Sequence, residues 1–259
     1  MSPARWVARE IGPPLAGIVG LLVVWAVVAA VTTTDSIPSP ADVWNAFVDA
    51  VRDGTLAEAT WRTLVRLAFS FTVAVALGTA IGVGLALHEF TRRSIRPLIV
   101  ALQITPFVAW VPIAVIWFGL TERAVVFVAV VGAFPSMTLA TIQAFRQVPP
   151  LYERAGRTLG ARGWDLYRRI IFPAALPGYM AGLQQAWGFA WKALMAGELI
   201  VAAAASTGLG HLLAEQEGDV TALLAALAVI VAIGVAVEYL VFGRLDRSIR
   251  RRRGLLLEG

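Results

Sequence analysis

The stretch 151-LYERAGRTLGARGWDLYRRIIFPAALP-177 decides the fold, because it carries seven charged side chains between two long apolar segments. Pro149 and Pro150 stop the preceding helix and can open a new one at the start of this stretch. Gly160 and Gly163 then interrupt the new helix, since glycine adopts backbone conformations that other residues avoid. The pattern predicts two short helices joined at a glycine elbow.

Both of these helices are predicted to be amphipathic. Apolar residues recur at intervals of three and four, which places them on one face of each helix: Leu151, Ala155 and Leu159, then Trp164, Tyr167 and Ile171. A compact helix pair with exposed aromatic residues suits a groove on a soluble partner protein. The residues alone leave two alternatives open, in which the arginines only anchor the membrane topology or the helices lie in the lipid interface.

The composition is that of an integral membrane protein. Of 259 residues, 58% are apolar and 15% are charged, whereas soluble domains are about 25% charged. The pI near 10.4 does not indicate nucleic-acid binding, because the arginines cluster beside apolar segments and form no continuous soluble basic face. The chain has no cysteine, which excludes disulfides, thiolate metal sites and cysteine nucleophiles.

Six apolar segments have about the length needed to cross a bilayer, whose core takes roughly 20 helical residues. They cover residues 13–31, 64–87, 97–118, 124–145, 177–201 and 221–243. No alternating ten-residue pattern indicates a barrel, so we expect an all-α membrane protein. A resemblance of the first segment to a cleaved signal peptide, ending in Ala29-Ala30, leaves a five-span alternative open.

The arginines predict which side each connection faces. If six spans alternate, four basic clusters fall on one side: Arg5 and Arg9; Arg92, Arg93 and Arg96; Arg146, Arg154, Arg157, Arg162, Arg168 and Arg169; and Arg244, Arg247 and Arg250 to Arg253. The opposite connections are acidic or short. Positive charge marks the cytoplasmic side, so both termini are predicted to be cytoplasmic.

The expected organisation follows from these spans and charges. It comprises a cytoplasmic N-terminus over 1–12, a first transmembrane helix over 13–31, an outer loop over 32–63, a five-helix core over 64–243 with a connecting loop over 146–176, and a basic cytoplasmic tail over 244–259. The outer loop contains the segment 36–54, where Pro40 and Ser39 predict a helix start. This short amphipathic helix is expected either on the membrane surface or as an ordinary loop helix.

Ionisable residues inside a span are costly, which makes Lys192 and Glu198 candidates for function. They are six residues apart, about 240° around a helix, so they cannot pair directly on a straight helix and each needs another partner. One hypothesis is that Lys192 lines a pathway for an anion. The alternative is a structural charge that is satisfied within a dimer or reaches an interface.

Polar and helix-bending residues mark two of the predicted spans. They are Gln103, Thr105, Pro106, Trp110 and Pro112 in the third, and Gln184, Gln185, Trp187 and Trp191 in the fifth. Bent helices with polar groups at mid-membrane suit a translocation route, while helix–helix hydrogen bonding is the alternative. The candidate pathway residues are Gln103, Trp110, Gln184, Trp187, Trp191, Lys192 and Glu198.

Catalytic motifs are missing from the sequence. The only lysine follows Trp191, so no P-loop exists, and the zinc motif HExxH fails because Arg92 replaces its second histidine. No G-x-S-x-G elbow occurs. We therefore expect a non-catalytic protein without a metal or cofactor of its own.

The spacing of the charged stretch resembles the coupling-loop signature of bacterial ABC importer permeases. That pattern is Glu-Ala-Ala, three residues, Gly, nine residues, Ile, one residue and Leu-Pro. Here Gly160 is followed after nine residues by Ile170-Ile171-Phe172-Pro173, and the triplet falls on Arg154-Ala155-Gly156, of which only the middle alanine matches. Glu153 lies one residue early.

Further short sequence motifs over about residues 38–245 resemble those of the nitrate, sulfonate and taurine branch of these permeases. They are Arg157-Thr158-Leu159-Gly160-Ala161, Pro173-Ala174-Ala175-Leu176-Pro177, Leu64-Val65-Arg66, Trp117-Phe118-Gly119 and Thr207-Gly208-Leu209-Gly210. The resemblance implies a type I importer fold that moves a small anionic solute such as a sulfonate, taurine or nitrate. A permease for a heterocyclic vitamin precursor, such as a thiamine pyrimidine or riboflavin, is the alternative within transport, and a membrane scaffold or receptor is the alternative of another class.

The resemblance also implies partners and a coupling site. The charged stretch would sit in a cleft of a cytoplasmic ATPase that binds ATP, through Arg154, Ala155, Gly156, Arg157, Leu159, Gly160, Ala161, Trp164, Ile170 and Pro173. The family combines two permease subunits, two ATPase subunits and an external binding protein. One set of six spans suits a permease homodimer.

Overall fold

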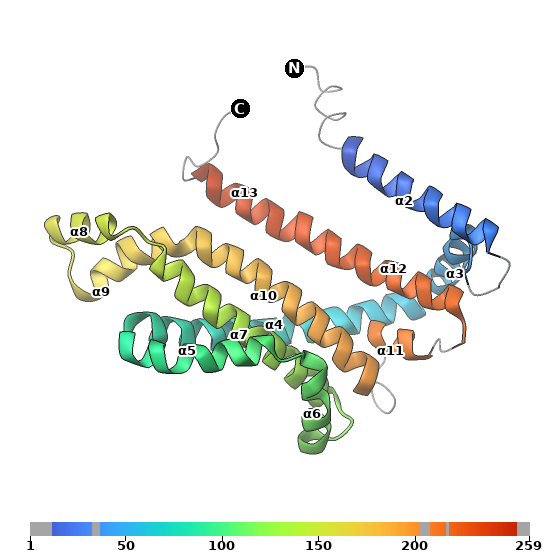
Figure 1. The fold of residues 1–259 in the computed structure, drawn as a ribbon, viewed down its shortest axis with the longest axis horizontal. Coiled ribbons are helices and arrows are strands. Elements are labelled where there is room, and N and C mark those ends of the chain that lie inside the picture. Colours follow the sequence, from blue (N-terminus) through green and yellow to red (C-terminus); the bar gives the residue numbers. More distant parts are fainter. Residues whose placement is uncertain (1–11, 33–36, 202–207, 216–217, 253–259) are drawn as a thin grey trace.

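The computed structural model describes residues 12–32, 37–201, 208–215 and 218–252, which form helices joined by short connections and contain no strand (Figure 1). The helices are α2 (Gly12–Val31), α3 (Pro40–Arg52), α4 (Thr55–Leu87), α5 (Glu89–Ile104), η1 (Phe107–Trp110), α6 (Val111–Phe118), α7 (Glu122–Arg146), α8 (Pro150–Thr158), α9 (Gly163–Leu166), η2 (Tyr167–Ile171), α10 (Phe172–Val201), α11 (Leu209–Glu215), α12 (Val220–Val237), η3 (Glu238–Phe242) and α13 (Gly243–Arg252). The all-α prediction is confirmed. Arg5, Arg9, Thr207, Arg253 and most of the predicted N-terminal segment lie outside the described residues.

The spans differ in part from the six expected. Among the described residues, three helical stretches are long and apolar enough to cross a membrane, namely α4, α7 and Val220–Leu245. The predicted third span is broken into α5 and η1–α6, which are bent by 96°, and this pair makes a fourth span if counted as one. α10 has 30 residues but is not among these apolar helices; its interior contains Pro177, Lys192 and Glu198.

The core forms where α4 and α10 pack on either side of α7. Gly78 and Gly82 bring α4 close to α7, because a Cβ at Gly82 would lie 2.6 Å from the Thr141 Cβ. Gly182 does the same for α10, where a Cβ would lie 2.5 Å from the Ala140 Cβ. The glycines spaced by four residues therefore serve the close helix packing that their spacing permits.

The outer segment begins with a well-capped helix. Ser39 and Asp42 form a capping box at the start of α3, with Pro40 in its first turn, as the sequence predicts. Val43 of this helix is buried, while its neighbour Trp44 is exposed. Trp25 of α2 donates a hydrogen bond from Nε1 to the Pro38 carbonyl at 3.2 Å, which ties the first helix to the start of this segment.

Replacing Gly82 with leucine should destabilise the bundle, because the added side chain meets Thr141 and the backbone oxygen of Thr138. Overpacking of this kind costs about 1–3 kcal/mol. Gly84→Leu is the matched control, since a Cβ at Gly84 has open space within 4 Å. Thermal unfolding in a mild detergent measures both, and equal melting temperatures for the two variants would contradict the close approach.

Candidate functional site

The glycine elbow joins α8 to α9 as predicted, but the second helix is not short, because it continues through Pro173 and Pro177 into α10. Gly160 has φ +89° and Gly163 has φ +52°, in the left-handed region that favours glycine. The Ala161 amide donates to the Gly156 carbonyl at 2.9 Å and closes the end of α8. From Gly163 onward the backbone stays helical through α9, η2 and α10. The elbow therefore stands at one end of a helix that continues into the core.

The inside of the elbow is packed around Gly156. A Cβ at this position would lie 2.3 Å from Cδ1 of Ile170 and 2.9 Å from Cδ1 of Leu166. This contact gives a physical reason for the glycine that departs from the family triplet at Arg154-Ala155-Gly156. Since α8 and η2 touch without intervening space, the two arms of the elbow are joined as one packed unit.

The outside of the elbow carries exposed apolar side chains. Leu159 is 87% exposed and Trp164 is 68% exposed, and Leu151 and Tyr152 are also exposed. The predicted second apolar face is divided: Ile171 is buried, whereas Trp164 is exposed and its ring makes a T-shaped contact with the ring of Phe172. Of the candidate coupling residues, Arg154, Ala155, Arg157, Leu159, Gly160, Trp164 and Pro173 are exposed, Ala161 and Ile170 are half-buried and Gly156 is buried.

The polar residues of α10 divide between two sides of the helix. Gln184 donates to Glu238 of η3, and Trp187 stacks on Trp191 with ring centroids 6.3 Å apart. These three candidate pathway residues therefore lie near the last span. Gln103 and Trp110, on α5 and η1, are half-buried.

Lys192 lies on an exposed side of α10, together with Gln185. Its ammonium is 6.0 Å from the centre of the Phe189 ring. Lys192 is the only basic residue of α10. The structure thus separates Lys192 from Gln184, Trp187 and Trp191.

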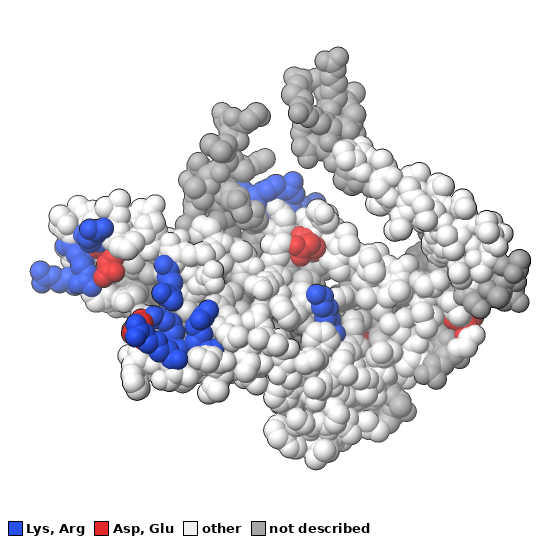
Figure 2. All heavy atoms as spheres, in the orientation of Figure 1, with Lys and Arg blue, Asp and Glu red and all other residues white. Residues whose placement is uncertain are grey.

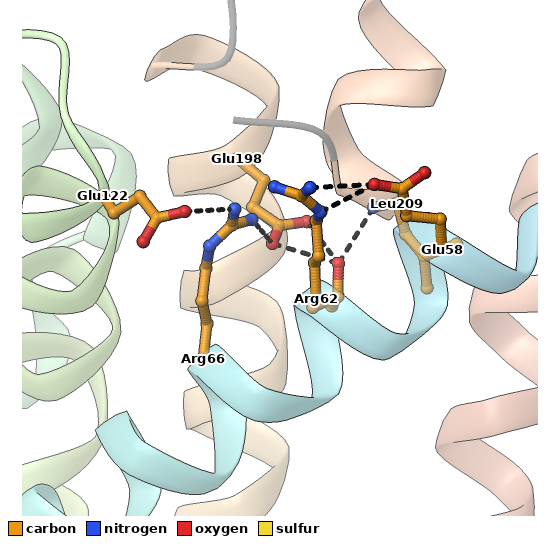
Figure 3. Close-up of polar contacts among 7 residues, drawn as sticks. Glu58, Arg62, Arg66, Glu122, Glu198 and Leu209 are labelled. Carbon is orange, nitrogen blue, oxygen red and sulfur yellow. Dashed lines mark hydrogen bonds and ion pairs between the residues drawn. The ribbon is translucent and has the colours of Figure 1, made fainter. Parts of the chain in front are cut away.

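Glu198 lies near the opposite end of α10 from the elbow and is fully buried. Its carboxylate accepts hydrogen bonds from Arg66 Nη1 at 2.8 Å (Figure 3) and from Thr63 Oγ1 at 2.8 Å. It also accepts one from the Gly210 amide at 3.0 Å. Thr63 Oγ1 in turn accepts from the Leu209 amide at 2.9 Å. We call Thr63, Arg66 and Glu198 the buried clamp. It joins α4, α10 and the start of α11.

Two glycines leave room for this carboxylate. A Cβ at Gly208 would lie 2.6 Å from the Glu198 carboxyl carbon, and one at Gly210 would lie 2.5 Å from its Cβ. The Gly208-Leu209-Gly210 sequence therefore lets the backbone of α11 approach the charge and donate to it. Arg66 also reaches outward, where Nη2 donates to Glu122 at the start of α7 at 2.8 Å.

Sequence patterns identify Glu198 but neither its partners Thr63 and Arg66 nor Glu122, the second carboxylate partner of Arg66. Arg66 was noted only as part of the motif Leu64-Val65-Arg66, which resembles the permease family. Two signals in the sequence were available: an arginine within an apolar segment at the end expected to face outward, and a glutamate without a basic residue at helical spacing. Neither signal says that the two side chains meet.

Glu198→Gln should destabilise the protein strongly, because it leaves the buried Arg66 guanidinium without its charged partner at Nη1. Removing one member of a buried pair costs about 3–5 kcal/mol. Glu122→Gln is the control, since Glu122 is 57% exposed. Ion pairs with an exposed member contribute roughly 0–1 kcal/mol to the free energy of unfolding. Thermal unfolding in detergent measures the difference, and a Glu122→Gln loss as large as that of Glu198→Gln would be contrary to this assignment.

Comparison with known proteins adds evidence from related chains. Residues 74–251 match the family described as binding-protein-dependent transport system inner membrane component. The bicarbonate transport system permease protein CmpB of Synechococcus elongatus is 28% identical over 238 residues, which cover 87% of this chain and 84% of that protein. The taurine transport system permease protein TauC of Escherichia coli is 28% identical over 245 residues, covering 90% and 88%.

Solved structures share the fold. An inward-facing structure of the MetNI methionine ABC transporter aligns with a TM-score of 0.63 and 20% identity over 75% of this chain and 96% of that chain. An amino acid ABC transporter aligns with a TM-score of 0.57 and 18% identity over 80% and 98%. Because the family match spans more than half of the chain, this chain belongs to the family of binding-protein-dependent transport system inner membrane components, and it is a non-catalytic ABC transporter permease.

Proposed function

We propose that this chain forms the translocation pathway of an ATP-driven importer for a small anion, as a homodimer that receives its solute from an external binding protein. In this proposal the elbow faces the cytoplasm and seats a separate ATPase subunit. The observation that carries the proposal is the set of exposed apolar side chains, above all Leu159 and Trp164, among the charged residues of an internally packed elbow. Exposed apolar groups of this kind are typical of a docking surface.

The helix that leaves the elbow supplies a mechanical connection to the membrane. Backbone from Gly163 to Val201 is helical throughout, and a helix rises about 1.5 Å per residue. Trp187, Lys192 and Glu198 all lie on this helix. A movement of the elbow by a closing ATPase is therefore passed to the bundle as a displacement of α10 against α7, in the manner of rigid-body gating.

An anion is favoured by Lys192 and by the relatives. Lys192 presents an uncompensated ammonium on the exposed side of α10, with no ion pair to an acidic side chain among the described residues. Relatives are named for bicarbonate and for taurine transport, and both solutes carry an anionic oxygen group. The basic clusters at the elbow and at Arg92, Arg93 and Arg96 support the cytoplasmic placement of that end and of both termini.

Replacing Leu159 and Trp164 together with aspartate should abolish capture of the ATPase, because it puts charge on the proposed docking surface while the buried elbow contacts remain. We expect at least tenfold less ATPase to co-purify with the permease after mild detergent extraction. Phe90→Asp is the matched control, since Phe90 is 84% exposed and lies in the basic connection on the same proposed side. Retention of the ATPase by L159D/W164D, with normal permease yield, would refute the docking surface.

Lys192→Met should lower solute uptake by at least tenfold without lowering assembly, because it removes the only positive charge on α10. Lys192→Arg keeps the charge and should keep most of the uptake. The measurement is entry of radiolabelled taurine and bicarbonate into vesicles containing the whole transporter, with its binding protein and ATP supplied. Unchanged uptake by K192M, in complexes of normal composition, would remove Lys192 from the pathway.

A further inference from the structure

A polar cleft lies between α5 and α7 at the end of the bundle near the elbow. It encloses about 350 Å³ and is lined by Arg96, Leu139, Ile142, Gln143, Arg146 and Gln147. Four of these six side chains are polar, and the two cations come from different helices. Figure 2 shows basic side chains gathered over the end of α5 that lies below α8 and α9.

The two arginines of the cleft differ from their neighbours in their ion pairs. Arg92 and Arg93 both pair with Glu89, and the hydrogen bond from Arg93, with a further one from Arg92, lowers the pKa of Glu89. Among the described residues, no acidic side chain forms an ion pair with Arg96 or Arg146. The cleft therefore concentrates positive charge that the described part of the chain does not neutralise.

The chemistry of this lining selects a class of ligand. Guanidinium groups bind phosphate, sulfate and carboxylate groups through paired N–H donors, and glutamine amides can donate further hydrogen bonds to the same oxygens. Leu139 and Ile142 supply an apolar floor. Basic pockets between membrane helices at the cytoplasmic side are suited to anionic lipid headgroups.

We propose that Arg96 and Arg146, with Gln143 and Gln147, form a binding site for an oxyanion at this end of the bundle. The phosphate of an anionic phospholipid and a free oxyanion in solution share this chemistry. The site goes beyond the proposed transport function, because the cleft and its charges belong to a single chain; only its lipid form rests on the proposed cytoplasmic placement of this end. It is also separate from the exposed apolar residues of the elbow.

The test compares the purified wild-type chain with the double variant R96Q/R146Q in a neutral detergent. R244Q/R247Q is the matched control, because it removes the same charge from two exposed arginines of α13, outside the cleft. One arm adds phosphatidylglycerol or phosphatidylcholine and counts bound lipid by native mass spectrometry. The other arm adds sulfate or inorganic phosphate without lipid and follows the melting temperature.

Saturable binding that falls at least tenfold in R96Q/R146Q, and is kept in R244Q/R247Q, supports the site. If only phosphatidylglycerol shows it, the ligand is a lipid headgroup; if sulfate or phosphate shows it without lipid, the ligand is a free oxyanion. Equal losses in both double variants would show that binding follows net charge alone and would overturn the proposal. Absence of saturable binding in both arms would overturn it as well.

Discussion

The arrangement of the bundle depends on the hydrogen bonds that the buried carboxylate of Glu198 accepts. This carboxylate is inaccessible to solvent and accepts hydrogen bonds from a guanidinium and a hydroxyl of α4 and from a backbone amide of α11. A charge in such a place is stable only when its hydrogen bonds are made, since desolvation of an unpaired carboxylate costs far more than one hydrogen bond returns. The clamp therefore fixes where α4, α10 and α11 meet.

The buried clamp and the elbow occupy opposite ends of one helix. The elbow is packed on its inside and apolar on its outside, whereas the clamp is entirely internal. Between them, small residues let α10 lie against α7 at close range. This design combines a stiff connection with a close and mostly non-polar contact. Among the described residues, the ion pairs that link α10 and α7 lie at the clamp end, where Arg66 joins Glu198 and Glu122.

Local sequence rules predicted the parts of the fold that depend on neighbouring residues. Pro149, Pro150, Gly160 and Gly163 act through their own backbone preferences, so the elbow was predictable, as was the capped start of α3 at Ser39. The break after Ile104 was not predicted, although Pro106 was recognised as a bend. An apolar run shows its total length but not the angle between its two halves.

The contacts of the candidate site could not be predicted in the same way. Thr63 and Glu198 are 135 residues apart in the chain, and nothing in either segment encodes the approach of the other. Trp164 and Ile171 illustrate a similar limit, because helical spacing puts them on one face while an intervening π-helix, η2, turns one inward and leaves the other exposed. Spacing rules hold only while the helix keeps its regular pitch.

The 96° break between α5 and α6 has an electrical consequence. Pro106 has no N–H to offer the carbonyl four residues earlier, and such a group is too costly to leave in hydrocarbon, so the break must meet water or protein. If water rather than protein meets the break, it thins the insulating layer locally. The membrane voltage would then fall over a shorter distance, and a charge in that water would cross less of the electric field.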